Sequence, residues 1–357
     1  MIKYLGSKRR LVPALGRLFA ASEAVTALDL FTGTTRVAQE FCRHGGLVTA
    51  VDIARYSEVL AQCYVATDAA TVDAAEVADA IARLDALPDV RGYFTRTFCE
   101  ESRYFQPKNG MRIDAIREGI DTYFPDGALR PILLTSLMEA ADAVDSTVGV
   151  QMAYLKQWAP RASNDLRLRI PELTPGSGTA VRGNALTLVD QLPKVDLAYL
   201  DPPYNQHRYF TNYHLWETLI RWDAPAHYGI ACKRIDSRDS STKSVFNLKR
   251  EMPEALARTI KGVRADVLVV SFSDEGYVPL GDLVNMCRQR DDTVEVLAFD
   301  SKRYVGALIG IHNPKGKKVG VVSHTRNTEY VLLSGGPDQV ARMAASVAER
   351  SPGRVST

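Results

Sequence analysis

The chain has 357 residues, of which 46% are hydrophobic, so it can bury the core of one large domain or of two ordinary ones. Its 44 basic and 42 acidic residues leave a formal net charge of +2, which by itself does not indicate a polyanion-binding protein. Any nucleic-acid surface must therefore come from local clusters of charge. No stretch approaches the roughly 20 apolar residues of a membrane span, and we expect no membrane association.

The five cysteines are scattered and odd in number. They have neither the density of a disulfide framework nor the C-x-x-C spacing of zinc sites. This pattern favours a reducing, cytoplasmic compartment and predicts no metal site. The apolar run near the N-terminus is interrupted by Arg17, so we do not expect a targeting signal there.

The first ninety residues alternate between helix and strand patterns. A helix is expected after Ser7, a residue type that often caps helices. Further strands are expected over residues 25–30 and 48–51, and further helices over residues 34–44, 56–64 and 74–87. Strands that alternate with helices predict a parallel sheet.

The middle of the chain has a different pattern. From residue 93 to about residue 169 the strand signal disappears, and polar turns alternate with helical patterns, which predicts an all-helical insertion. Strands are expected again over residues 180–181, 195–200, 267–271, 293–299 and 330–333. The last two are expected to form an antiparallel pair that finishes the sheet.

A polar turn, Asp29-Leu30-Phe31-Thr32-Gly33-Thr34, follows the first expected strand. In an open parallel sheet, ligands bind beyond the carboxyl ends of the strands. The turn lacks the G-x-G-x-x-G pattern that lets a backbone approach a pyrophosphate, and Asp29 would repel a phosphate. We therefore expect a nucleoside that has no phosphates and carries a cationic group. S-adenosylmethionine, with its ammonium and sulfonium groups, fits this description.

Asp52 ends the next expected strand, about twenty residues further on. In this position its carboxylate can accept hydrogen bonds from ribose hydroxyls, and Ile53 can lie against an adenine ring. The alternative is that Asp29 and Asp52 are ordinary strand-end carboxylates that cap nearby backbone amides.

The expected strand at residues 195–200 runs directly into Asp201-Pro202-Pro203-Tyr204. The exocyclic amine of adenine is a poor nucleophile because its lone pair is delocalised into the ring. Two acceptors, the Asp201 carboxylate and a carbonyl in the rigid Pro202-Pro203 segment, would favour a pyramidal nitrogen. Tyr204 offers a ring for stacking on the base, and direct in-line transfer would follow from positioning and electrostatics. The alternative is a structural turn, since Asp-Pro often ends a strand.

Three motifs in this order resemble those of the Dam-like (alpha-group) DNA adenine-N6 methyltransferases. Lys3-Tyr4-Leu5-Gly6-Ser7-Lys8 is similar to their K-[WY]-x-G-[GS]-K motif, residues 29–34 to D-x-F-x-G-[ST], and residues 201–204 to D-P-P-Y. That family places its cofactor motifs first, then a recognition insertion, then the catalytic tetrapeptide. The resemblance spans most of residues 1–340.

The resemblance implies a cofactor site for S-adenosylmethionine and a role for each matching residue. Tyr4, Gly6 and Lys8 would close over the cofactor; Asp29, Phe31, Gly33 and Thr34 would hold its methionine portion; Asp52 and Ile53 would hold the nucleoside; and Asn184, Ala185 and Asp201 would complete the site. Asn184 departs from the family, which often has aspartate there. An amide can still donate or accept a hydrogen bond at that position.

Adenine inside a duplex must be flipped out to reach such a site, at a cost of a few kcal/mol that phosphate contacts must offset. Between Cys232 and Arg250 there are six basic residues against two acidic ones, which predicts a loop that contacts phosphates. A merely solvated loop is the alternative. The candidate DNA-binding residues are Arg208, Lys243, Lys249 and Arg250, and Arg161, Arg167 and Arg169 of the insertion are candidates for sequence readout.

The predicted fold is α/β, with the Rossmann-like sheet of S-adenosylmethionine-dependent methyltransferases, mostly parallel with an antiparallel last strand. We expect a catalytic domain of residues 1–92 and 180–337, a helical target-recognition insertion of residues 93–179, and a C-terminal helix and tail of residues 338–357. The expected substrate is double-stranded DNA, at the nucleoid of the cytoplasm. A cognate restriction endonuclease is expected as a functional rather than a physical partner.

Other functions remain open at this stage. Methylation of adenine in RNA would use the same tetrapeptide, and a catalytically silent DNA-binding module would keep the same fold. Methylation of a protein glutamine is less favoured, because the enzymes that resemble this chain in that class usually carry asparagine where Asp201 stands. Cytosine-C5 methylation needs a nucleophilic cysteine, and no Pro-Cys dipeptide occurs here.

Overall fold

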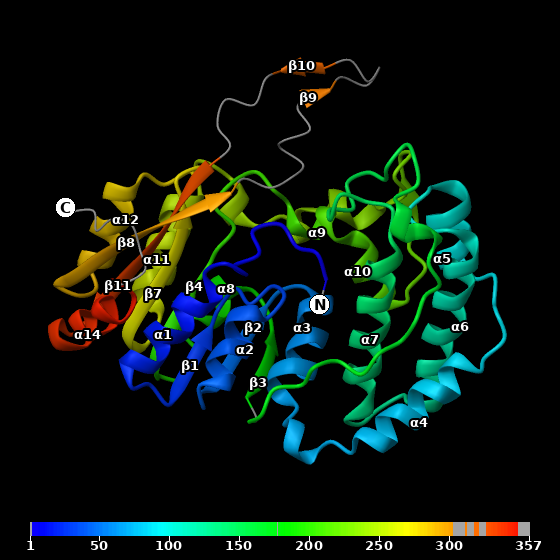
Figure 1. Cartoon of the computed structure of the whole chain (residues 1–357). Helices are drawn as coiled ribbons and strands as arrows, with labels where there is room; N and C mark the ends of the chain where they lie inside the picture. The colour runs from blue at the N-terminus through cyan, green and yellow to red at the C-terminus, as the bar shows by residue number, and fades with distance from the viewer. Residues whose placement is uncertain (1, 177, 303–310, 313–317, 321–325, 349–357) are drawn as a thin grey trace.

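The computed structural model describes residues 2–176, 178–302, 311–312, 318–320 and 326–348. Its central feature is a seven-stranded sheet with the order β3-β2-β1-β4-β7-β11-β8 (Figure 1). The strands are β1 (Thr26–Asp29), β2 (Leu47–Asp52), β3 (Thr179–Arg182), β4 (Val195–Leu200), β7 (Ala265–Ser273), β8 (Thr293–Lys302) and β11 (Arg326–Gly335). Neighbours pair in parallel except at β11, which is antiparallel to both β7 and β8. The prediction of a mostly parallel sheet with an antiparallel last strand is confirmed.

Helices cover both faces of this sheet because its strands alternate side chains between two apolar layers. In β4, Leu197 and Tyr199 point into one layer, and Ala198 and Leu200 point into the other. The first layer is completed by α1 (Val12–Ser22), α2 (Arg36–Arg43) and α14 (Pro337–Ala348), and the second by α8 (Ala185–Leu188), α11 (Met252–Gly262) and α12 (Leu280–Arg288). The C-terminal helix α14 packs against α1 and the β8–β11 pair.

A second, helical half lies beside the sheet and has its own core (Figure 1). It contains α3 (Arg55–Ala61), η1 (Gln62–Ala66), α4 (Ala74–Asp85), α5 (Tyr93–Thr95), η3 (Arg96–Glu101), α6 (Pro107–Tyr123), α7 (Leu129–Val144), α9 (Tyr209–Asn212) and α10 (His214–Arg221). The described residues from 93 to 178 contain no strand. The core of this half contains side chains of residues 93–178 together with side chains of α3 and α4, which precede them, and of α10, which follows them.

Short elements complete the chain. They are the antiparallel pair β5 (His227–Tyr228) and β6 (Lys233–Arg234), the antiparallel pair β9 (Ile311–His312) and β10 (Lys318–Gly320), and the 3-10 turns η2 (Ala69–Thr71), η4 (Pro160–Ser163), η5 (Ile235–Arg238), η6 (Ser240–Thr242) and η7 (Val245–Asn247). None of the helices in the described ranges is both long and apolar enough to cross a membrane.

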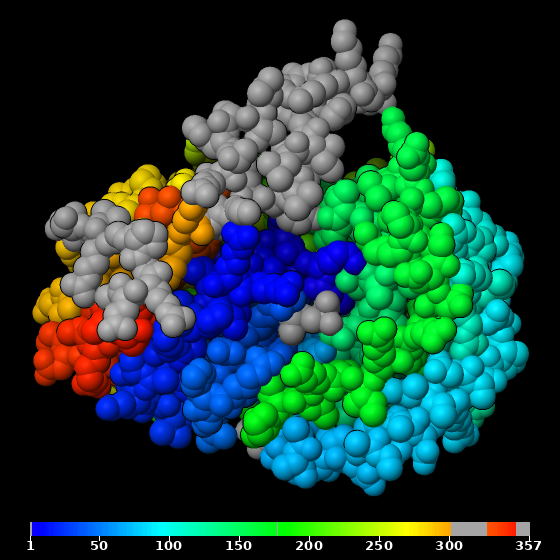
Figure 2. All heavy atoms as spheres, viewed as in Figure 1, coloured from blue at the N-terminus to red at the C-terminus, as the bar shows by residue number. Residues whose placement is uncertain are grey.

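The N-terminal segment connects the two halves. It runs along the surface between them, in deep blue in Figures 1 and 2. Lys3 forms ion pairs with Asp142 at 2.9 Å and with Asp145 at 3.3 Å in the helical half. The expectation that Ser7 caps the first helix is wrong. Helix α1 begins at Val12 without a side-chain cap, because the backbone of residues 8–11 turns first.

Candidate active site

Three carboxylates lie along one edge of the sheet, because three parallel strands end there. Asp29 ends β1, Asp52 ends β2, and Asp201 directly follows β4. The register places Asp29 opposite both Ala50 of β2 and Tyr199 of β4. This is the edge at which open parallel sheets bind ligands.

A cavity of about 180 Å³ opens at this edge. Most of the residues predicted to bind a cofactor line it: Tyr4, Gly6, Phe31, Gly33, Asp52, Ile53, Asn184, Ala185 and Asp201. Asp29, Thr34 and Lys8 do not line it; they are buried, with exposed fractions of 1%, 5% and 8%. The predicted cofactor-binding residues therefore fall into two groups: those that line the cavity and three polar residues that are buried.

Sequence reasoning missed one whole wall of this cavity. Residues 241–247, within the segment predicted to be a DNA-contacting loop, line it together with Tyr209. The Phe246 ring meets the Phe31 ring edge-on, with centroids 5.1 Å apart at 84°. The Asn247 side chain donates hydrogen bonds to the carbonyls of Asn205 and His207, at 2.7 and 3.0 Å. An apolar Phe246 amid basic and hydroxyl residues was the signal that this segment packs against the protein.

Gly33 allows the N-terminal motif to close over the first turn. Its φ of +52° is one that side chains rarely adopt, and a Cβ there would lie 3.2 Å from the Tyr4 ring. Tyr4 in turn stacks on Tyr213 of the helical half, with ring centroids 4.5 Å apart. A side chain at position 33 would therefore push Tyr4 away from its stacking partner.

Asp52 caps two backbone amides while it faces the cavity. One carboxylate oxygen accepts from the Gly33 amide and the other from the Ala54 amide, each at 2.9 Å. Burial raises the pKa of Asp52, although these hydrogen bonds oppose the shift. The capping role weighed from sequence is thus present, and the carboxylate also lies in the cavity wall. Each carboxylate oxygen can accept two hydrogen bonds, so Asp52 can still accept further hydrogen bonds from a ligand.

Asp29 is buried and only half satisfied. Its Oδ2 accepts a hydrogen bond from the Thr32 hydroxyl at 2.8 Å, whereas Oδ1 has no hydrogen-bond partner in the described structure. Burial raises the pKa of Asp29 to about 7. A buried acceptor without a partner is costly, and a cationic ligand group beside it would remove that cost.

Asp201 is held by Lys8 of the N-terminal motif. Lys8 Nζ lies 3.0 Å from Asp201 Oδ1 and forms a second ion pair with Glu329. Burial raises the pKa of Asp201 to about 6; Lys8 opposes this shift and Glu329 adds to it. The Asp201 side chain keeps 18% of its surface exposed, so it remains accessible from the cavity.

Glu329 was not predicted from the sequence. It lies on β11, opposite Ser273 at the end of β7, because β11 runs antiparallel and enters the sheet at the edge where the parallel strands end. The Ser271 hydroxyl lies 3.4 Å from its carboxylate. Only the register of the β7–β11 pair brings it beside Lys8.

The rest of the tetrapeptide packs against the neighbouring strand. Pro202 is buried and Pro203 lines the cavity. The Tyr204 ring lies 5.8 Å from the Phe272 ring, and Lys8 Nζ lies 5.8 Å from the centre of the Tyr204 ring. Burial raises the pKa of Tyr204 to about 12. The Tyr204 carbonyl accepts from the Tyr277 amide at 2.9 Å, which fixes the end of the turn.

The basic residues predicted to contact DNA have different environments. Arg208 is half-buried and donates to the Ser237 carbonyl at 2.6 Å. Lys243 is exposed and lines the sheet-edge cavity. Lys249 and Arg250 are exposed.

The three arginines proposed for sequence readout also differ. Arg161 forms a 2.6 Å ion pair with Asp145 and is engaged within the fold. Arg167 and Arg169, together with Lys108, line a second cavity of about 730 Å³ in the helical half.

Comparison with known proteins identifies the family. A family described as D12 class N6 adenine-specific DNA methyltransferase matches residues 4–263. The chain is 28% identical over 324 residues to the modification methylase StsI of Streptococcus sanguinis, which covers 85% of this chain and 49% of that protein. It is 29% identical over 265 residues to the type II methyltransferase M.NlaIII of Neisseria lactamica, which covers 71% of this chain and 77% of that protein.

The chain thus spans about half the length of StsI and about three quarters of M.NlaIII. A solved precorrin-6y C5,15-methyltransferase from Geobacter metallireducens aligns over 94% of this chain and 92% of that chain, at 12% identity. Its TM-score of 0.29 is too low to carry an argument. The family match contains all three sheet-edge carboxylates and nearly all of the N-terminal motif. The chain belongs to the D12 class of N6 adenine-specific DNA methyltransferases.

Proposed function

We propose that this protein transfers a methyl group from S-adenosylmethionine to the N6 amine of an adenine flipped out of a specific double-stranded DNA sequence. The D12 family uses S-adenosylmethionine as its methyl donor. The observation that carries the proposal is the position of Asp201. Its partly exposed carboxylate faces the sheet-edge cavity and is fixed there by Lys8.

The residues present fit the cofactor. The partnerless Oδ1 of Asp29 suits the ammonium group of its methionine portion. Asp52 has acceptor capacity for ribose hydroxyls, and Ile53, 56% exposed at the cavity, offers an apolar face for the adenine. Asn184 uses its side chain to cap the Leu186 amide at 3.0 Å and also lines the cavity. When bound, S-adenosylmethionine supplies an electrophilic methyl group on its sulfonium.

The chain's own residues prepare the amine for attack. We assign Asp201 as the acceptor of one N–H of the target amine and the Pro202 carbonyl as the acceptor of the other. Two acceptors favour a pyramidal nitrogen with an available lone pair, and Tyr204 holds the base by stacking. Asp201 would accept the proton that the amine loses on methylation and would release that proton to solvent. Lys8 keeps Asp201 ionised and correctly oriented before this step.

We propose double-stranded DNA as the substrate, which places the protein at the nucleoid. The exposed Lys249 and Arg250 supply phosphate contacts near the catalytic edge. The helical insertion, residues 93–179, is proposed to read the target, with Arg167 and Arg169 facing its cavity.

Residues 1–92 and 180–337 form the proposed catalytic domain. A cognate restriction endonuclease is the proposed functional partner, since two of the relatives are named modification or type II methylases.

The test is transfer of a labelled methyl group from S-adenosylmethionine to unmethylated genomic DNA, followed by digestion to nucleosides. Asp201→Ala should abolish transfer and leave cofactor binding nearly unchanged. Asp196→Ala is the matched control, because Asp196 lies at the start of β4, away from the carboxyl edge. Label in N6-methyldeoxyadenosine supports the proposal. Label in RNA alone overturns the choice of DNA, and cofactor binding without transfer to either would indicate a silent binding module.

A further inference from the structure

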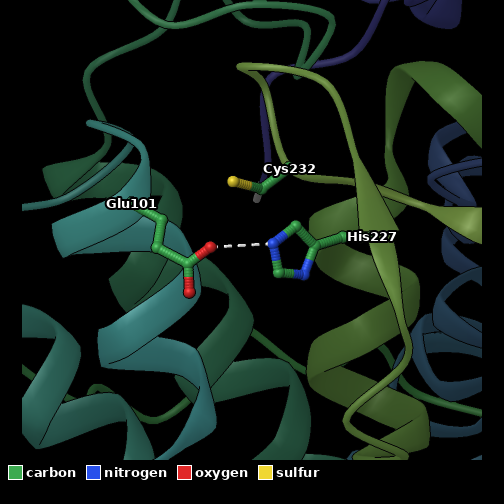
Figure 3. Close-up of side chains that lie close together, drawn as sticks. All are labelled: Glu101, His227 and Cys232. Atoms are coloured by element: carbon green, nitrogen blue, oxygen red, sulfur yellow. Dashed lines mark hydrogen bonds and ion pairs between the residues drawn. The ribbon is translucent and has the colours of Figure 1, made fainter.

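Glu101, His227 and Cys232 come together in the helical half (Figure 3), and none of the three lines the sheet-edge cavity. Glu101 ends η3, and the other two side chains belong to the β5–β6 hairpin. His227 Nε2 lies 2.9 Å from Glu101 Oε2, and one potential ligand atom from each of the three residues lies within 4.8 Å of the others. Glu101 and His227 are 126 positions apart, so the cysteine spacing of the sequence did not predict this cluster.

The backbone holds the Cys232 thiol toward the pair. Cys232 has a φ of +44°, in the left-handed region that residues other than glycine rarely adopt. Its amide donates to the Gly229 carbonyl at 3.0 Å, and the Tyr104 hydroxyl donates to the preceding Ala231 carbonyl at 3.1 Å. The Cys232 side chain is buried. The turn is thus tied to the segment that follows Glu101.

We propose that Glu101, His227 and Cys232 bind one divalent transition-metal ion of the zinc type. Imidazole nitrogen, thiolate sulfur and carboxylate oxygen are the ligands that Zn²⁺ takes in proteins. Metal–ligand bonds of about 2.0–2.3 Å in a tetrahedron separate ligand atoms by roughly 3.3–3.8 Å. The Glu101 side chain is 53% exposed, so it is free to rotate by the amount that closes the set. A solvent molecule completes the tetrahedron on the exposed side.

The binding step is not a redox reaction. The Cys232 thiol releases its proton to solvent as its sulfur binds the metal, and His227 binds through a neutral ring nitrogen. The Glu101 carboxylate leaves its hydrogen bond with His227 and binds the metal instead.

The role of the ion is to join two separate segments. It ties the end of η3 to the hairpin that precedes residues 235–247, the last of which form a wall of the cofactor cavity. Metal binding should therefore stabilise the folded protein by mass action and reduce the motion of that wall. The site does not depend on the proposed methyl transfer.

The test uses Co²⁺ as a spectroscopic probe on the full chain after removal of metals with a chelator. We expect one Co²⁺ per chain, with the thiolate-to-cobalt charge-transfer absorption of a cysteine ligand, and displacement of that absorption by Zn²⁺. Cys232→Ser should remove the absorption. Glu101→Gln and His227→Ala should weaken Zn²⁺ binding by more than about tenfold, since losing even an outer partner of a ligand costs that much.

His44→Ala is the matched control. His44 also pairs with a glutamate, Glu40, at 3.6 Å, but that pair is not part of a three-ligand cluster in the described structure. Its Co²⁺ spectrum and Zn²⁺ affinity should equal those of the wild type. Glu101 is exposed, so Glu101→Gln tests the site even if Cys232→Ser does not fold. Absence of the charge-transfer absorption, or Zn²⁺ affinity unchanged in Glu101→Gln and His227→Ala, would overturn the proposal.

Discussion

Lys8 Nζ lies 3.0 Å from Asp201 Oδ1 and is also paired with Glu329, so a carboxylate that follows β4 and a carboxylate on β11 share one lysine. The three side chains are 7%, 18% and 10% exposed, respectively. In such surroundings, removing Lys8 leaves two carboxylates without their shared cation, whereas removing either carboxylate leaves a balanced lysine–carboxylate pair. The N-terminal motif therefore pairs with the proposed catalytic carboxylate through Lys8 and also packs over the Gly33 turn through Tyr4.

Replacement of Lys8 by methionine should slow methyl transfer by roughly 10²-fold, the effect of losing one preorganised electrostatic contact. Lys8 lowers the pKa of Asp201, so its loss should also move the acid limb of the pH–rate profile to higher pH. Single-turnover rates across a pH series measure both effects. Lys3→Met is the control, because Lys3 belongs to the same motif but pairs with Asp142. An equal change in both variants would show that the motif acts only through folding.

The wild-type rate should fall as the pH drops through about 6. The proposed role of Asp201, in which it takes up the proton that the amine loses, needs the ionised carboxylate, and burial raises the pKa of Asp201 to about 6. Glu329 contributes to that rise, so Glu329→Gln should move the midpoint to lower pH while the plateau rate at high pH changes less. The measurement is the midpoint of the single-turnover profile. A midpoint that moves to higher pH in this variant would contradict the assigned coupling.

Replacement of Asp52 by alanine should weaken S-adenosylmethionine binding by about tenfold or more, because a half-buried acceptor in the cavity wall is lost. It also removes two caps on backbone amides, so stability should fall as well. Asp196→Ala separates these effects. Asp196 also accepts from two amides, those of Val25 and Thr26, but at the opposite edge of the sheet.

Calorimetric titration and thermal melting should be done on both variants. Asp196→Ala should lower the melting temperature and keep the wild-type dissociation constant. If Asp52→Ala keeps the same dissociation constant, Asp52 is only a structural cap and has no place in the cofactor site.

The strands of the sheet could be predicted because each strand is marked by an apolar run within a few neighbouring residues. The apolar run at residues 195–200 is β4, and an acidic residue after such a strand falls at the carboxyl edge wherever the strand sits. The D-x-F-x-G-[ST] turn was placed for the same reason. Local sequence thus located Asp29, Asp52 and Asp201 at one edge without any knowledge of their contacts.

Long-range contacts were not predictable in this way. Glu329 reaches Lys8 across 321 positions only because of the register of an antiparallel strand. Residues 241–247 belong to the segment predicted to contact phosphates, and its basic composition does not reveal that Phe246 packs on Phe31. The Glu101–His227 pair depends on a fold-level meeting of two segments. Each of these contacts joins residues that are far apart in the sequence, so it cannot be predicted from a short segment of the chain.

The basic residues after Cys232 can be tested in two groups, Lys249 with Arg250 and Lys243 alone. Replacing Lys249 and Arg250 together by alanine should reduce the salt dependence of DNA binding, with the slope of log K against log salt smaller by about 1.8, or about 0.9 per phosphate contact. Lys243→Ala should leave that slope unchanged and instead weaken cofactor binding, because Lys243 lines the proposed cofactor cavity. Fluorescence anisotropy of labelled duplex across a salt series measures the slope.

Lys194→Ala is the control for charge alone. Lys194 is exposed and paired with Asp266 at 2.5 Å near the start of β4, far from the catalytic edge. Its removal should leave the slope within error of the wild type, because only a cation beside the duplex releases counterions when DNA binds. An unchanged slope in the Lys249 and Arg250 double variant would return that segment to the solvated alternative and would move the search for phosphate contacts to Lys108, Arg167 and Arg169.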